Sequence, residues 1–169
     1  MVPKRLGLQA YRLDGEIKTI FDSEFALLMS GVMLEELDRR EIVKLLPEEP
    51  GCYFWILNID DARYRIYLGR TSSVRRRVTD YSIEFQIHSP NDFKMRFFQS
   101  FVRAEFRTAK LDLYFTEIPL EKCKARETEM VKLYKPLINE RASATDQEKA
   151  LIKSAFGDYY SSVFSRKLL

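Results

Sequence analysis

The chain has 169 residues, of which 46% are hydrophobic, 13% aromatic and 31% charged. This composition is typical of a soluble globular protein and excludes a disordered or fibrous chain, while the length fits a single domain of about 50 to 250 residues. The net charge of +3 and the pI of about 8.8 permit a polyanionic partner without requiring one.

Targeting signals and metal-binding cysteine patterns are not evident. The first residues, Met1 to Arg5, lead into mixed polar sequence, which argues against a cleaved secretory signal. Apolar stretches such as residues 53–57 are much shorter than the roughly 20 residues of a membrane-spanning helix. Cys52 and Cys123 have no CxxC spacing and no histidine nearby, so we expect two buried thiols. These features favour a cytoplasmic protein.

Two kinds of element are expected in the N-terminal part. Residues 8–13 and 16–21 flank Asp14-Gly15, a dipeptide favoured in tight turns, and this predicts a small β-hairpin. Residues 23–46 carry apolar side chains at helical spacing. They predict one or two amphipathic helices, broken near Gly31 and stopped by Pro47.

The middle of the chain predicts three strands and three helices. Residues 52–59 and 63–68 form the two strands of a hairpin, and residues 111–118 form a third strand. Helices are expected after a capped start at residues 71–73, from about residue 92 to 107, and over residues 120–134, which Pro136 ends.

A last amphipathic helix is expected near the C-terminus. Thr145-Asp146-Gln147-Glu148 matches a capping box, and apolar positions continue at helical spacing to Phe164. Its apolar face needs a partner, either the same domain or a second copy of the chain, so both a monomer and a homodimer stay open. The expected organisation is a hairpin and helical extension (residues 1–46), a core (residues 47–141) and this helix (residues 142–169).

Three short motifs occur in the core in a fixed order. The first two are Gly51-Cys52-Tyr53 and Tyr67-Leu68-Gly69, one on each strand of the predicted hairpin. A basic helix start with Arg77 and Tyr81 follows them. The third motif runs from Glu127 through Lys135-Pro136 to Asn139. Each motif alone is weak, but their joint occurrence at this spacing is rarely a matter of chance.

Together these motifs resemble the signature of the GIY-YIG nucleases, and the domain is similar to the N-terminal nuclease domain of bacterial excision-repair nucleases. Cys52 and Leu68 replace the isoleucines of the signature. The resemblance covers residues 46–139. It implies a small α/β (α+β) domain with a three-stranded antiparallel sheet flanked by helices. It also implies a metal-dependent endonuclease that hydrolyses phosphodiester bonds in DNA with Mg²⁺ or Mn²⁺.

The resemblance implies roles for six residues. Glu127 matches the metal-binding carboxylate of the family, and Mg²⁺ needs few protein ligands because it keeps several waters. Arg77 matches the catalytic arginine, whose guanidinium suits a phosphate oxygen. Two signature tyrosines, a helix position and a closing asparagine complete the match: Tyr53, Tyr67, Tyr81 and Asn139.

The roles of the tyrosines and the asparagine are less specific. One signature tyrosine is thought to act in the family as general base or water-orienting group, and the sequence does not choose between Tyr53 and Tyr67. A free phenol has a pKa of about 10, so it acts as a base only if cations or a metal lower that pKa. Tyr81 is implied to contact phosphate or relay a proton, and Asn139 to brace the site.

Further residues are expected to contact the nucleic-acid backbone, because phosphate contacts dominate such binding. They are Arg70, Thr71, Arg75, Arg76, Lys94, Arg103 and Lys135. A competing interpretation makes the run of arginines an ordinary exposed helix face. Glu129 is a rival to Glu127, but two positions along a helix it points to another face. His88 is interpreted as a surface residue, with a contact to the substrate as the lesser alternative.

Two alternatives to a DNA nuclease stay open. One is a catalytically inactive module of the same fold that binds nucleic acid or protein, and it is distinguished by binding without metal-dependent turnover. The other is RNA as the substrate, which uses the same chemistry and differs in groove shape and the 2′-hydroxyl. The insert between Tyr81 and the third strand is longer than a minimal domain of the family needs, so it leaves the substrate specificity open.

Overall fold

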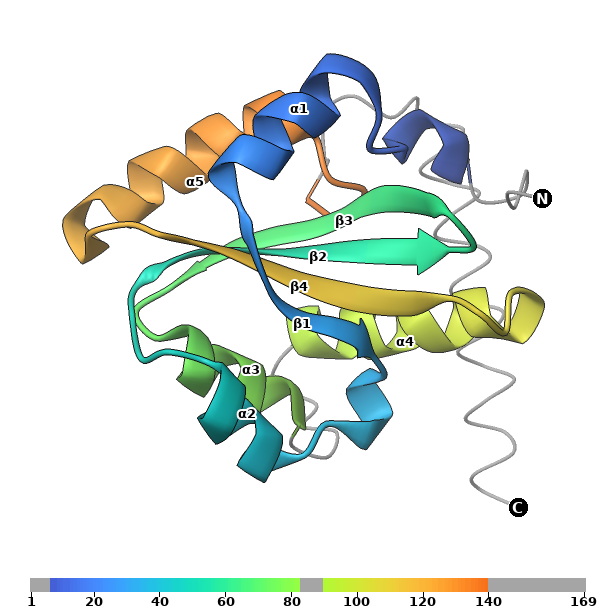
Figure 1. The fold of residues 1–169 in the computed structure, drawn as a ribbon, viewed down its shortest axis with the longest axis horizontal. Coiled ribbons are helices and arrows are strands. Elements are labelled where there is room, and N and C mark those ends of the chain that lie inside the picture. Colours follow the sequence, from blue (N-terminus) through green and yellow to red (C-terminus); the bar gives the residue numbers. More distant parts are fainter. Residues whose placement is uncertain (1–6, 83–89, 140–169) are drawn as a thin grey trace.

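The computed structural model describes residues 7–82 and 90–139. Over these residues the chain forms one four-stranded sheet and five α-helices. Figure 1 shows three layers. Helices α1 (Gly15–Glu24) and α5 (Leu120–Tyr134) cover one face of the sheet, and α2 (Arg39–Leu45), α3 (Val74–Ser82) and α4 (Pro90–Glu105) lie on the other. The fold is therefore mixed α/β, as predicted.

The sheet is antiparallel throughout. Its spatial order is β1 (Ala26–Val32), β4 (Lys110–Glu117), β2 (Gly51–Ile59) and β3 (Ala62–Thr71). Strand β2 is therefore central, and β3 is an edge strand. Because helices cover both faces of the sheet, β2 has no solvent-exposed side, and this explains its nearly continuous apolar sequence.

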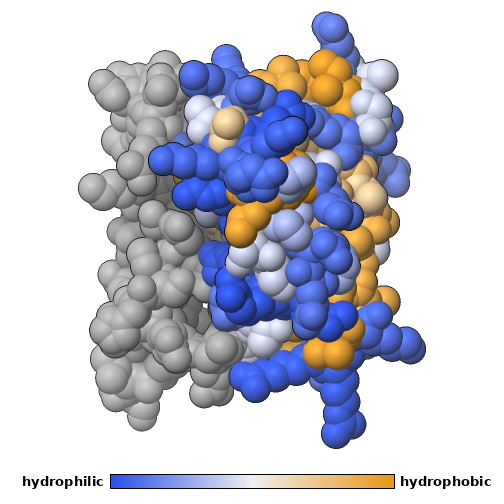
Figure 2. Space-filling view, turned by 90° about the vertical axis from the view of Figure 1, so that its left-hand side faces the viewer, coloured by the Kyte–Doolittle hydropathy of each residue, from blue (hydrophilic) through white to orange (hydrophobic). Residues whose placement is uncertain are grey.

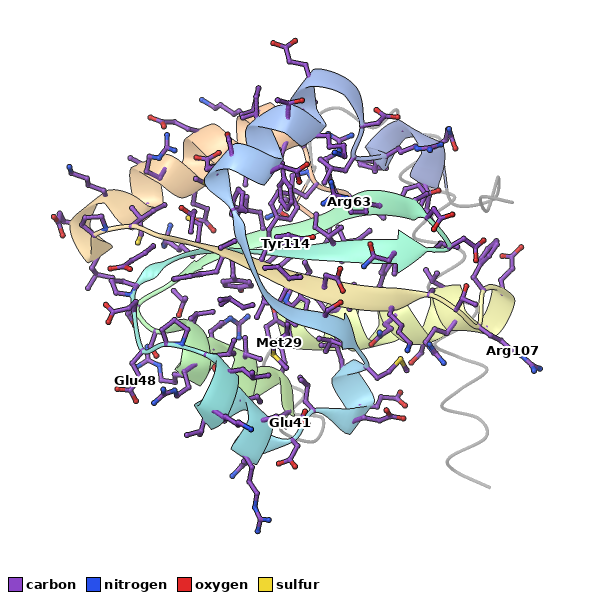
Figure 3. The ribbon with its side chains drawn as sticks, viewed as in Figure 1. Met29, Glu41, Glu48, Arg63, Arg107 and Tyr114 are labelled. Carbon is purple, nitrogen blue, oxygen red and sulfur yellow. The ribbon has the colours of Figure 1, made fainter. Side chains whose placement is uncertain are left out.

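Two apolar clusters fill the spaces between the sheet and its helix layers. Phe21 of α1 and Tyr134 of α5 belong to one cluster. Val78 of α3 and Phe98 of α4 belong to the other and larger cluster. Met29 of β1 is part of this second cluster, and Figure 3 shows it between β1 and the helices below the sheet. Burial on both faces fixes the register of the strands, because a slip by one residue would exchange the two sets of side chains.

The hairpin predicted around Asp14-Gly15 is wrong. The segment before this dipeptide forms the short 3-10 helix η2 (Leu8–Tyr11), and the segment after it forms α1. Ile17, Ile20 and Phe21 recur at a spacing of three and four residues and pack on the core beneath α1. This helical period outweighs the turn preference of the dipeptide, whose glycine starts the helix instead.

The helices predicted for residues 23–46 are wrong in the first half. Residues 26–32 form β1, so the predicted three-stranded sheet is corrected to four strands. The pairing of β1 with β4 is irregular on both sides of Met29. Gly31 there adopts a φ of 65° and donates its N–H to Asp112 at 2.8 Å. The leucines and methionine favour a helix locally, but the open edge of β4 supplies backbone partners.

The remaining elements agree with the predictions. The second half of residues 23–46 forms the short helix η3 (Leu34–Glu36) and then α2. Strands β2, β3 and β4 and helices α3, α4 and α5 occur where they were expected, and Cys52 and Cys123 are buried free thiols. His88 and the predicted helix over residues 145–164 lie outside the described residues.

The insert between Tyr81 and β4 contains α4, which is tied to the end of β1. The buried side chain of Gln99 donates to the carbonyl of Val32 and accepts from the N–H of Leu34, both at 2.8 Å. Within the described part of the chain, none of the helices has the length and apolar character that a membrane crossing requires.

Candidate functional site

A glycine in each of the first two motifs allows the strands and side chains around it to pack closely. Tyr53 of β2 pairs with Gly69 of β3. A Cβ atom on Gly69 would lie 2.5 Å from the hydroxyl oxygen of Tyr53, and a Cβ on Gly51 would lie 2.1 Å from the carbonyl oxygen of Thr116. Neither glycine has a positive φ. Close packing, and not turn geometry, therefore requires both glycines.

We expect Gly69→Ala to destabilise the protein by about 1–3 kcal/mol, because the added methyl group overpacks the site against the Tyr53 ring. Urea unfolding followed by circular dichroism measures this loss. An unchanged unfolding midpoint would contradict the close packing of these two residues. The displaced Tyr53 should also lower any activity that depends on its neighbours.

Tyr53, Arg77 and Tyr81 form a cluster between β2 and α3. The Arg77 Nε donates to the Tyr53 hydroxyl at 3.0 Å, and the hydroxyls of Tyr53 and Tyr81 are 3.4 Å apart. The Arg77 guanidinium carbon also lies 4.7 Å from the centroid of the Tyr81 ring, a cation–π distance. Both tyrosines are buried, whereas 20% of the Arg77 side chain is exposed. The buried rings therefore fix the direction of a guanidinium that reaches the surface.

Burial keeps both motif tyrosines protonated. It raises the pKa of Tyr53 well above 10, and Tyr81 adds to this effect while Arg77 opposes it. Burial also raises the pKa of Tyr67, with a further contribution from Tyr53. Neither phenol is therefore predisposed to act as a base near neutral pH. Tyr67 is only partly buried and is the more accessible of the two.

Glu127 of α5 contacts the end of β3. Its Oε2 accepts a hydrogen bond from the Arg70 guanidinium at 2.8 Å, and the two side chains are 23% and 46% exposed. Glu129 instead forms an ion pair with Arg126 on its own helix at 2.8 Å. The structure thus separates the two glutamates, and of these two only Glu127 meets the motif strands.

A basic cavity of about 360 Å³ lies at this end of the sheet, where β3 ends and α3 and α5 begin. It is lined by Arg70, Thr71, Ser72, Arg76, Arg77, Leu120, Cys123 and Lys124. Four of these described lining residues are basic and none is acidic, a charge distribution that attracts anions. Figure 2 views the molecule from this side and shows a largely hydrophilic surface over the described residues.

Three of the residues expected to contact phosphate line this basic cavity. Arg70 is held by Glu127, and Arg76 donates to the hydroxyl of Ser72 at 2.6 Å. The Thr71 hydroxyl exchanges hydrogen bonds with the backbone of Ser73. Thr71 therefore shapes the turn into α3, and the two arginines are the groups that can bind an anion.

The other expected phosphate contacts lie elsewhere. Arg75 of α3 donates to the carbonyl of Leu46 and pairs at 3.0 Å with Glu48, which Figure 3 labels and which lies between α2 and β2. Arg103 donates to the carbonyl of Ala109, between α4 and β4, and Lys135 ends α5 in a left-handed conformation, with a φ of 46°. The structure does not bring these three residues to the basic cavity. The side chain of Lys94 lies outside the described residues.

Asn139 closes the edge of β3. Its amide oxygen accepts from the N–H of Leu68 at 2.8 Å, and its amide nitrogen donates to the Leu68 carbonyl at 2.7 Å. The preceding residues pair with the same edge through Leu137 and Ile138. The segment after α5 therefore acts like a further strand that holds Tyr67 and Gly69 on either side of Leu68.

We expect Asn139→Ala to lower the free energy of unfolding by about 1–3 kcal/mol, because it leaves both backbone groups of Leu68 without their partners. Thermal and urea unfolding measure the effect. Lys132→Ala, at an exposed position of α5, is the control and should stay within about 0.5 kcal/mol of the native protein. Equal stability of the two variants would contradict this role of Asn139.

Lys124 is the residue that the sequence analysis missed. It lines the basic cavity and precedes Glu127 by three positions on α5. Residues three apart on a helix share a face, so the position of Lys124 beside Glu127 was readable from the sequence once Glu127 was assigned.

The capacity of this region for a metal ion depends on Glu127. Among the described residues, no group of three or more His, Cys, Asp or Glu side chains is arranged to hold a metal. Mg²⁺ binds through one or two carboxylates together with phosphate oxygens and waters. Glu127, beside the basic cavity, fits that pattern when Arg70 moves off its carboxylate.

In comparisons with known proteins, no family model, no curated protein and no solved structure matches this chain.

Proposed function

We propose that the protein is a metal-dependent endonuclease of the GIY-YIG type that hydrolyses phosphodiester bonds in DNA. The observation that carries this proposal is that Arg77 and Arg70 line one basic cavity at the end of the sheet, where Tyr53 contacts Arg77 and Glu127 contacts Arg70. Arg77 comes from α3, Arg70 from β3 and Glu127 from α5. A set of side chains that served only packing would have no need to surround an anion-attracting cavity.

Arg77 is the proposed catalytic cation. Its inner side is engaged by Tyr53 and Tyr81, so its direction is fixed before a substrate arrives. A guanidinium that is held in place needs no reorganisation as negative charge builds on the phosphate oxygens. In this proposal Tyr53 is a positioning residue that acts through Arg77.

Tyr67 is the proposed water-orienting group. The Tyr67 residue is less buried than Tyr53, and a protonated phenol can hold a water through a hydrogen bond without taking its proton. Hydrolysis forms a bond between the water oxygen and phosphorus and breaks the ester P–O bond. The water proton passes to the solvent, and the leaving oxygen gains a proton.

Glu127 is the proposed ligand for Mg²⁺ or Mn²⁺. Such a cation, when bound, neutralises charge on the phosphate and makes a nearby water more acidic. Glu127 contributes one carboxylate, and Arg76, Arg77 and Lys124, which line the basic cavity, hold the phosphate. Asn139 keeps the strand that carries Tyr67 in register.

The ion pair between Arg70 and Glu127 favours a second candidate function. A carboxylate neutralised by an arginine is a weaker metal ligand, and a protein that had lost its metal could still bind nucleic acid through the basic cavity. This candidate is a module that binds nucleic acid or another protein without turnover. The two functions differ in whether a divalent metal causes the substrate to be cut.

The test is a substrate survey with the purified full chain. Linear duplex DNA, single-stranded DNA and RNA are each incubated with Mg²⁺ or Mn²⁺, and parallel samples contain EDTA. We expect EDTA-sensitive internal cuts in DNA. Cleavage of RNA alone would replace the proposed substrate, and retention of DNA in a mobility-shift assay without any cleavage would support the binding module.

A further inference from the structure

The Arg70 side chain takes part both in the ion pair with Glu127 and in the lining of the basic cavity. Its guanidinium donates to the Glu127 carboxylate, 57 residues away, and the same side chain lines the basic cavity. Because 46% of the Arg70 side chain is exposed, it is free to turn between these two directions without unpacking the core. Arg70 therefore connects the proposed metal ligand with the proposed position of the phosphate.

The three other cations of the basic cavity are independent of Glu127. Arg76 contacts Ser72, and Arg77 is held by Tyr53. The Lys124 amino group makes no hydrogen bond or ion pair with the described part of the protein, and the side chain is exposed. A phosphate that enters the basic cavity therefore meets at least one cation that is available at once.

A divalent cation and the Arg70 guanidinium compete for Glu127. Both are positive, so the cation binds the carboxylate well only after the guanidinium has left. In this structure the Glu127 carboxylate accepts one hydrogen bond from Arg70, whereas a phosphate in the basic cavity can accept two parallel ones and also faces the other cations. The loss of an exposed ion pair costs little, so this exchange is accessible at equilibrium.

Building on the proposed nuclease function, we propose that Arg70 couples phosphate binding to metal binding. A phosphate group held by Lys124 and Arg76 draws Arg70 away from Glu127 and so makes the carboxylate available to a divalent cation. The structure in hand is then the resting form, in which Glu127 is occupied by an arginine. By linkage, the metal must raise the affinity for phosphate by the same factor as the phosphate raises the affinity for the metal.

The test measures Mn²⁺ binding directly, by the electron paramagnetic resonance signal of the free ion. The full chain is titrated with Mn²⁺ in the absence and presence of dimethyl phosphate, a small phosphodiester without base or sugar. We expect dimethyl phosphate to raise the Mn²⁺ affinity by about threefold or more, the scale set by release of an exposed ion pair. Titration in the other order should give the same factor.

Arg70→Ala separates the coupling from direct contact between metal and phosphate. Without the guanidinium, Glu127 is always available, so the Mn²⁺ affinity in the absence of dimethyl phosphate should rise by about threefold. Lys124→Ala should keep the low Mn²⁺ affinity of the resting form but weaken the effect of dimethyl phosphate. Lys122→Ala, an exposed lysine on the same helix that does not line the basic cavity, is the matched control and should behave like the native chain.

Glu127→Gln shows whether the measured ion is at the proposed site, because it should lose Mn²⁺ binding with or without dimethyl phosphate. An Arg70→Ala variant whose Mn²⁺ affinity equals that of the native chain overturns the coupling, even if the native protein cuts DNA. A native chain that neither binds Mn²⁺ nor cuts DNA overturns the proposed function itself. The two failures are therefore distinguishable.

Discussion

Glu127→Gln is expected to lower metal-dependent DNA cleavage by about 10³-fold or more, because a divalent cation contributes several kcal/mol to the transition state of such a reaction. Glutamine keeps the size of the side chain and can still accept the hydrogen bond from Arg70, but it removes the negative charge proposed to bind the metal. The protein should remain folded, and its affinity for DNA in EDTA should be retained or increased. Single-turnover cleavage of a labelled duplex, together with binding in EDTA, measures both effects.

Glu129→Gln is the matched control for this prediction. Glu129 lies on the same helix and also forms an ion pair with an arginine, but that arginine is Arg126 and not a residue of the basic cavity. Cleavage by this variant should stay close to the native rate. Near-native cleavage by Glu127→Gln, or a loss of cleavage confined to Glu129→Gln, would show that Glu127 is not the metal ligand.

Arg77→Ala is expected to reduce turnover by about 10²–10³-fold, because it removes a donor that faces the phosphate as charge develops. The loss should appear in kcat more than in KM, since Arg70, Arg76 and Lys124 still hold the anion. Tyr53 and Tyr81 keep their contact with each other, so the fold should persist. Steady-state cleavage kinetics and thermal unfolding measure these effects.

Two further variants make the Arg77 result specific. Arg77→Lys retains the positive charge but loses the planar fork, so it should restore only a small part of the activity. Arg39→Ala removes an exposed arginine of α2, away from the basic cavity, and should leave kcat unchanged. If Arg39→Ala and Arg77→Ala reduced cleavage equally, Arg77 would have no specific catalytic role. It would then contribute only to the overall positive charge that attracts DNA.

The parts of the fold with strong local signals were predictable. Strands β2 and β3 are dense in aromatic and β-branched residues with a short turn between them, and Pro136 marks the end of α5. Strand β1 was not predictable, because Leu27, Leu28 and Met29 favour a helix until the edge of β4 supplies hydrogen-bond partners. The wrong hairpin near the N-terminus came from giving a turn dipeptide more weight than the helical spacing that followed it.

The sequence predicted some neighbours in the candidate site but not their contacts, and Arg75, Arg103 and Lys135 lie away from the basic cavity. Spacing placed Arg77 and Tyr81 one turn apart on a helix, and the structure adds that Arg77 also contacts Tyr53 of β2 and pairs with Asp80 at 3.7 Å. The pairing of Arg70 with Glu127 joins positions 57 residues apart, which no local pattern encodes. The buried Arg65 is a similar case.

Arg65 is a buried charged residue of β3, and its guanidinium donates to the backbone carbonyls of Tyr11 and Tyr134. It thereby ties η2 and the end of α5 to β3. Nothing near Arg65 in the sequence indicates these two acceptors, because both lie more than 50 residues away. Such contacts follow from the tertiary arrangement alone.

The measurement that bears most directly on the proposed chemistry is nicking of supercoiled plasmid DNA by the native protein across the fractions of a size-exclusion column. Glu127→Gln is purified in parallel, so that a contaminating nuclease would appear in both preparations. We expect relaxed and linear DNA to form with Mg²⁺, in proportion to the protein in each fraction, and to be absent with EDTA and with Glu127→Gln. No conversion of the plasmid by the native protein, or equal conversion by Glu127→Gln, would contradict a metal-dependent phosphodiesterase built on this site.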